Sequence, residues 1–153
     1  MDSLKDLHSL LRWAVVLMAF YTLIRSFIGM SSKSSFSKTD NLSQVIYVSL
    51  VDVQVLIGLI LYFTSSIGFR NISLMGMKEV MHDGFFRFFA IEHITGMLLA
   101  FILLHIGRAK CKRALDGPAK FKTFFIWNLI VILILLATIP WPFRKGFEAL
   151  GWF

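Results

Sequence analysis

Residues 124–141 read FFIWNLIVILILLATIPW and carry no charged side chain. A helix needs about 20 mostly apolar residues to cross the hydrocarbon core of a bilayer, so this stretch predicts a membrane-spanning helix. Three stretches of the same kind precede it, at residues 10–30, 45–67 and 88–106. Because four spans use most of the 153 residues, the sequence predicts one integral membrane domain. Its expected fold is an all-α, four-helix transmembrane bundle with short loops and antiparallel neighbours.

The composition excludes most other classes of protein. Hydrophobic residues make up 57% of the chain and charged residues only 16%, which rules out a water-soluble domain. The net charge of +7 indicates anionic lipid headgroups rather than nucleic acid as the partner of the basic side chains. Cys111 is the only cysteine, so the chain cannot form an internal disulfide, a multi-thiolate metal site or a covalently attached c-type haem.

The basic residues predict the orientation of the spans. The run at residues 108–113, followed by Lys120 and Lys122, is the densest positive cluster in the chain. The positive-inside rule places this 108–122 loop in the cytoplasm. The serine- and lysine-containing linker at residues 31–41 then also lies inside, and both termini and the loop at residues 72–87 lie outside.

The ends of the spans carry their own signals. Pro140 and Pro142 predict the end of the last helix at the outer interface, because proline cannot continue a helix. The sequence at residues 72–82 predicts a short interfacial helix. Its methionines are also soft enough to bind Cu(I), but the interfacial helix is the simpler interpretation. An aromatic belt is expected from Trp141, Phe143, Trp152 and Phe153.

Ionisable and polar side chains within the spans are the most informative residues, because each costs about 2 to 3 kcal/mol to insert and needs a partner or a purpose. Counted by depth, they form two layers. The outer layer contains His8, Arg12, Arg87, Glu92 and His93. The inner layer contains Tyr21, Asp52, Gln54, His105 and Asn128.

The outer layer matches the needs of a b-type haem, which are axial imidazoles, an apolar slot and cations near the carboxylate edge. We expect His8 and His93 to be the axial metal ligands, because both lie within about two turns of the outer end of their helices. Arg12 and Arg87, or Arg70, are the candidates to meet the propionates. Glu92 is the candidate acceptor for an imidazole N–H.

The slot itself is expected from small and aromatic side chains. Ala90 and Gly96 lie three residues either side of His93 and so on nearly the same helix face. Small residues at this spacing also mark close packing of helices, and that interpretation stays open. The candidate walls are Trp13, Phe86, Phe88 and Phe89.

Two other functions fit the same residues. The polar groups within the spans could bind the helices of partner proteins, which would make the chain a cofactor-free accessory or assembly subunit of a membrane complex. Asp52, with His105 or a basic residue of the inner rim as its partner, could instead serve a quinone-reactive or proton-conducting subunit. Asp52 and Gln54 lie about 200° apart around their helix, so they cannot both face one ligand.

Three segments carry a resemblance to a known group: residues 7–13 (LHSLLRW), 87–95 (RFFAIEHIT) and 139–143 (IPWPF). Together they resemble small four-helix bacterial membrane proteins labelled cytochrome b or cytochrome b-like. The resemblance implies a bacterial inner membrane protein with non-covalent haem b, and His8 and His93 match the recurring histidines of that group. We therefore expect a membrane b-type cytochrome that carries single electrons through a bis-histidine haem near the outer face, between a quinol-linked donor and an unidentified acceptor.

Overall fold

The structure is a computed structural model and describes residues 2–151. Four long helices dominate it: α1 (Asp2–Ser31), α2 (Lys38–Thr64), α6 (Ile94–Arg113) and α7 (Gly117–Thr138). No strand occurs among the described residues, so the predicted all-α fold is confirmed. The chain has four helical stretches long and apolar enough to cross a bilayer, which makes it a multi-pass membrane protein.

Helices α1, α2 and α7 begin before the predicted apolar spans and α6 continues past its span to Arg113, whereas α2 and α7 end short of theirs, at Thr64 and Thr138. Helix α2 begins with a capping box: the Ser37 hydroxyl accepts from the Asp40 N–H, and the Asp40 carboxylate accepts from the Ser37 N–H at 2.9 Å. Helix α1 begins at residue 2, so His8 lies well inside it and not at its first turn. Residues 108–113 form the last turns of α6 and not a loop.

Short helices connect α2 to α6. They are α3 (Phe69–Met75), α4 (Met77–His82) and α5 (Gly84–Arg87), and a π-helical turn, η1 (Phe88–His93), leads from α5 into α6. The single helix predicted at residues 72–82 is therefore divided in two. Gly76 divides it with a φ of 83°, a backbone conformation that favours glycine.

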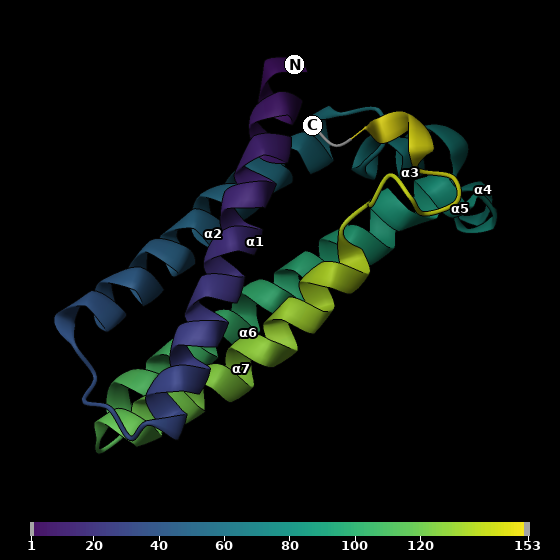
Figure 1. Ribbon diagram of the computed structural model, residues 1–153. Coiled ribbons are helices and arrows are strands. Elements are labelled where there is room, and N and C mark those ends of the chain that lie inside the picture. Colours follow the sequence, from purple (N-terminus) through teal and green to yellow (C-terminus); the bar gives the residue numbers. More distant parts are fainter. Residues whose placement is uncertain (1, 152–153) are drawn as a thin grey trace.

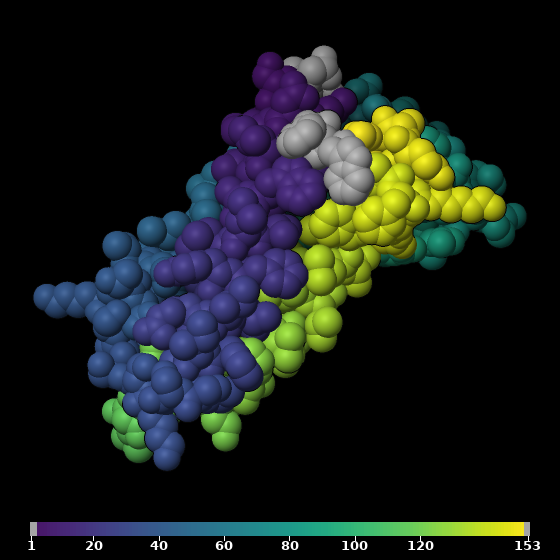
Figure 2. Space-filling model, in the orientation of Figure 1, coloured from purple at the N-terminus to yellow at the C-terminus, as the bar shows by residue number. Residues whose placement is uncertain are grey.

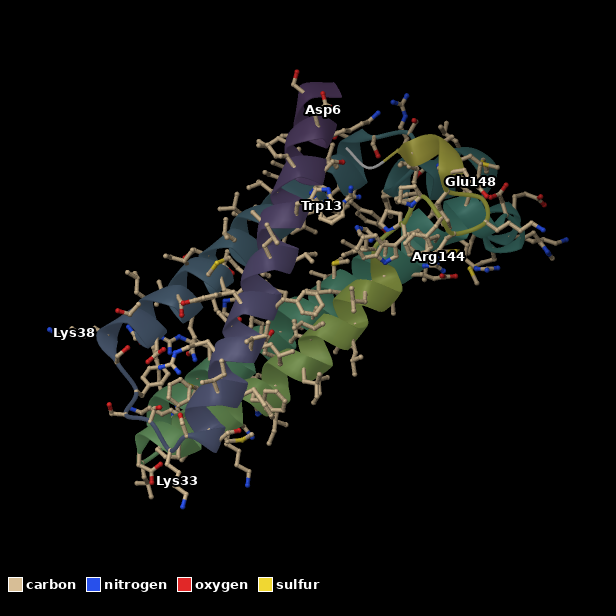
Figure 3. All side chains as sticks on the ribbon, in the orientation of Figure 1. Asp6, Trp13, Lys33, Lys38, Arg144 and Glu148 are labelled. Atoms are coloured by element: carbon tan, nitrogen blue, oxygen red, sulfur yellow. The ribbon has the colours of Figure 1, made fainter. Side chains whose placement is uncertain are left out.

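The long helices form a bundle whose two ends differ (Figure 1). Figure 3 places Asp6 and Glu148 at one end, called here the terminal end, and Lys33 and Lys38 at the other, called the basic end. Helices α1 and α7 pack in the middle of the bundle, where the Asn128 side chain donates to the Ala19 carbonyl at 2.9 Å. They diverge towards the terminal end (Figure 1).

The basic end brings together the two loops predicted to share one side of the membrane. Gly117 lies so close to the linker that a Cβ atom there would stand 2.4 Å from the Ser34 carbonyl oxygen. Arg108 is buried and donates to the Gln44 side-chain oxygen at 2.9 Å and to that of Asn41. Arg108 therefore does more than indicate which side of the membrane this end faces, because its hydrogen bonds connect the end of α6 to the first turns of α2.

The terminal end is closed by the segment that follows α7. This segment contains a single 3-10 turn, η2 (Glu148–Leu150). Figure 2 shows this segment, in yellow, beside α1, in purple, and Trp141 of the segment packs on Trp13 of α1 with ring centroids 6.0 Å apart. Both ends of the described chain therefore contribute to the same region of the molecule.

Candidate cofactor site

His8 and His93 face each other at the terminal end. His8 projects from α1 and His93 is the last residue of η1, and their ring centroids are 6.5 Å apart with an angle of 76° between the ring planes. Two imidazoles that bind one iron from opposite sides through bonds of about 2 Å have centroids about 6.2 Å apart. The separation of the two rings therefore matches that of a bis-histidine metal centre.

The two histidines line a cavity of about 340 Å³. This volume lies within the usual range for small-molecule sites, about 300 to 1,000 Å³. The cavity lies among α1, α2, α6 and the end of α7, where the helices diverge. Its wall is mainly apolar and includes Val15, Val55, Leu61, Phe89, Met97 and Leu135.

Two cationic side chains reach the same cavity. Lys5 and Arg12 line it together with His8, because spacings of three and four residues place all three on one face of α1. Asp6 also lines the cavity, so the charge there is net positive. An apolar slot with cations beside it suits a flat, hydrophobic ring that carries carboxylates.

His93 is held firmly through its ring. Its Nδ1–H donates to the main-chain oxygen of Thr138 at 2.7 Å. Thr138 is the last residue of α7, and the last carbonyl groups of a helix have no partner within it, so this oxygen is free to accept. Phe88 and Phe89 pack beside the imidazole with centroids 5.9 and 6.0 Å away. The hydrogen bond fixes the tautomer and, in the neutral ring, leaves Nε2 without a proton and able to accept a metal or a hydrogen bond.

His8 is held through its backbone instead. Gln54 donates a hydrogen bond from Nε2 to the His8 main-chain oxygen at 2.9 Å. The imidazole Nδ1 is buried and has no hydrogen-bond partner among the described residues. The ring packs on Gly58, where a Cβ atom would lie 3.2 Å from His8 Cε1. A buried ring nitrogen without a hydrogen-bond partner is costly, so Nδ1 is an unsatisfied polar atom of the described site.

Arg87 and Glu92 do not join this site. They bind each other at 2.8 Å, both half-exposed, and Arg87 also donates to the Met81 main-chain oxygen at 3.1 Å. Glu92 precedes His93 in the π-helical turn and points to another side of it. The Thr138 carbonyl is therefore the acceptor for His93 in place of Glu92, and Lys5 lines the cavity beside Arg12 whereas Arg87 does not.

The small residues expected to admit a macrocycle serve helix packing instead. A Cβ atom at Gly96 would lie 2.3 Å from Cγ2 of Thr138, so Gly96 allows α6 to approach α7. Ala90 is buried, and its main-chain oxygen accepts from the Tyr62 hydroxyl at 3.0 Å. Gly58, which the sequence did not single out, is the small residue beside a candidate ligand.

Of the expected aromatic walls, only Phe89 lines the cavity. Phe88 packs on Phe147 with centroids 4.7 Å apart, and Trp13 packs on Trp141 at 6.0 Å. Phe86 and Arg70 do not contribute to the described cavity wall either. Among the belt residues, Trp141 stacks on the exposed Phe143, whereas Trp152 and Phe153 lie outside the described residues.

The inner layer divides into separate contacts. His105 Nε2 lies 3.2 Å from Asp52 Oδ1, and both side chains are about 41% exposed on the surface between α2 and α6. Gln54 turns away from Asp52 towards His8, in agreement with their predicted separation around α2. Tyr21 is exposed and Asn128 is fully buried, so neither joins the Asp52–His105 pair.

The described residues contain no group of three or more His, Cys, Asp or Glu side chains that could hold a metal ion. The methionines at 75, 77 and 81 lie exposed on α3 and α4. Comparison of the chain with protein-family models, with curated proteins and with solved structures gives no match.

Proposed function

We propose that the chain is a membrane b-type cytochrome that holds a non-covalent haem b between His8 and His93 and carries single electrons. The observation that carries this proposal is the 6.5 Å separation of the two imidazole centroids. The apolar cavity around them and the cations Lys5 and Arg12 support it.

Each of these residues has a definite task in the proposed site. His8 and His93 would bind the iron, and Lys5 and Arg12 would meet the propionates. When bound, haem supplies one-electron redox chemistry that the side chains of this chain lack. The apolar wall excludes water, and the Thr138 carbonyl orients His93 and raises the basicity of its ligand nitrogen.

The same proposal includes a location and an orientation. Lysine and arginine side chains gather at the basic end, on the linker, at the end of α6 and at the start of α7. By the positive-inside rule, this end faces the cytoplasm of a bacterial inner membrane, and the histidine site lies near the outer face. Other membrane protein subunits would deliver and accept the electrons.

The first test is the visible absorption spectrum of the purified protein, recorded after oxidation in air and again after reduction with dithionite. We expect a Soret band and sharp reduced α and β bands, because two imidazole ligands give low-spin haem. A protein that stays colourless when expressed with ample haem would contradict the proposal. That result would favour the cofactor-free accessory subunit, whose histidines face partner helices.

Electron paramagnetic resonance of the oxidised protein gives an independent readout of the same site. Imidazole planes at 76° to each other are nearly perpendicular. Perpendicular axial planes leave two of the iron d orbitals close in energy, so we expect a highly anisotropic low-spin signal. A rhombic low-spin signal would show that the two rings are parallel and would contradict the observed arrangement.

A second candidate function depends on the contact between Asp52 and His105. Two proton-accepting groups 3.2 Å apart and half-exposed on the membrane-facing surface could take the protons that quinol oxidation releases. The Asp52→Asn variant is then expected to slow reduction of the haem by a short-chain quinol about ten-fold or more, with an altered dependence on pH. Rapid mixing followed at the reduced α band measures this rate.

The matched control for this test is Tyr21→Phe, because Tyr21 is an exposed polar residue of the inner layer that contacts neither Asp52 nor the cavity. Its rate should equal that of the unmodified protein. If Asp52→Asn also behaves as the unmodified protein across the pH range, the Asp52–His105 pair has no role in quinol oxidation.

A further inference from the structure

The two histidines of the site are held unequally. We propose that His8 is a displaceable ligand and that its side of the cavity binds a neutral diatomic molecule such as CO or NO. This inference depends on the proposed haem site, and it adds a function that electron transfer alone does not require.

The first argument is the difference in hydrogen bonding between the rings. The Nδ1–H of His93 donates to Thr138, whereas Nδ1 of His8 has no hydrogen-bond partner among the residues that the structure describes. A hydrogen bond at the second ring nitrogen makes an imidazole a stronger ligand, and its loss typically reduces metal affinity about 10- to 100-fold. His8 is therefore the weaker ligand of the pair.

The second argument is the packing of the His8 ring. The ring lies against the main chain of α2 at Gly58, where a Cβ atom would already stand 3.2 Å from His8 Cε1, so no side chain at this position encloses the ring. Rotation of the ring breaks no hydrogen bond between Nδ1 and the described residues. Gln54 meanwhile holds the His8 main-chain oxygen, so α1 stays in place while the ring moves.

The third argument is the chemistry of the wall. Val55 and Leu61 of α2 line the cavity on either side of Gly58, whereas the cations Lys5 and Arg12 lie on α1. An apolar wall accommodates a neutral ligand, which loses little hydration when it enters. Carbon monoxide fits this environment. The exchange breaks the bond from His8 Nε2 to ferrous iron and forms a bond from the CO carbon to the same iron, with no electron or proton transferred.

The test compares CO binding by the haem-loaded, dithionite-reduced full chain with that of two variants at one position. A Cβ atom at residue 58 would lie 3.8 Å from His8 Nδ1, so the hydroxyl of Gly58→Ser can come within hydrogen-bonding distance and supply the missing acceptor. Gly58→Ala adds the same bulk without the acceptor and is the matched control.

We expect CO to shift the Soret band of the unmodified protein, with an affinity about ten-fold lower in Gly58→Ser than in Gly58→Ala. His8→Ala provides a variant that does not depend on residue 58. It should retain haem through His93, show a high-spin spectrum before CO is added, and bind CO faster than the unmodified protein.

The outcomes separate the two proposals. A colourless unmodified protein contradicts the haem site itself. A low-spin protein whose Soret band does not respond to saturating CO would overturn the displacement of His8 while leaving the haem site intact. Equal CO affinities for Gly58→Ser and Gly58→Ala, with both variants folded and low-spin, would overturn it as well.

Discussion

Replacing His93 with alanine is expected to lower the haem content of the purified protein about ten-fold or more. This residue provides the firmer of the two proposed ligands, because its ring is fixed by the Thr138 carbonyl and packs beside Phe88 and Phe89. Nδ1 of the remaining His8 imidazole has no hydrogen-bond partner among the described residues. Haem per protein is measured from the reduced pyridine spectrum after purification from cells supplied with excess haem.

The control for this experiment is His105→Ala, which removes another imidazole further along the same helical stretch. His105 lies outside the cavity and pairs with Asp52, so its removal should leave the haem content unchanged. His8→Ala should fall between the two and keep haem in a high-spin form. A His93→Ala protein with a full, unaltered low-spin spectrum would contradict the assignment of His93.

Replacing Gly96 with leucine is expected to destabilise the protein by about 2 kcal/mol and lower its midpoint of thermal unfolding by about 5 °C. The first added atom, Cβ, would stand 2.3 Å from Thr138, so α6 and α7 must separate. That separation also stretches the hydrogen bond between His93 and the Thr138 carbonyl. Haem content should therefore fall together with stability, and both are measured on detergent-purified protein.

Gly84→Leu is the matched control, because a Cβ atom at Gly84 has no neighbour within 4 Å and the residue lies outside the cavity. This variant should unfold within about one degree of the unmodified protein and keep its haem. If Gly96→Leu has the same stability and haem content as this control, Thr138 does not position His93 by the close packing of α6 on α7.

The fold was predictable because a bilayer imposes a simple requirement on the chain. An apolar run such as residues 124–141 is stable only as a helix across the bilayer, and four such helices joined by short loops can pack in few ways. The pairing of His8 with His93 was also accessible, because depth in the membrane can be counted in residues. This count can be made without knowing which helices are neighbours.

The other features of the site depend on local helix geometry, on which helices pack together and on main-chain atoms, and none of these can be read directly from the side chains in the sequence. The direction of Glu92 follows from the π-helical turn at residues 88–93, which departs from the regular helical spacing. Gly58 lies far from His8 in sequence, and only the packing of α1 on α2 brings them together. The acceptor for His93 is a main-chain oxygen, which every residue carries. In retrospect Pro140 was its signal, because it ends α7 and leaves that oxygen exposed to a partner.

The composition of the cavity wall also constrains how the protein is made. The wall runs from Lys5 near the first turn of α1 to Leu150 beyond the end of α7, and α1 packs directly on α7. A nascent chain that emerges from the ribosome in sequence order therefore has only part of the cavity until its last helix enters the bilayer. Any cofactor held between His8 and His93 therefore meets its complete cavity only after α1 and α7 have come together.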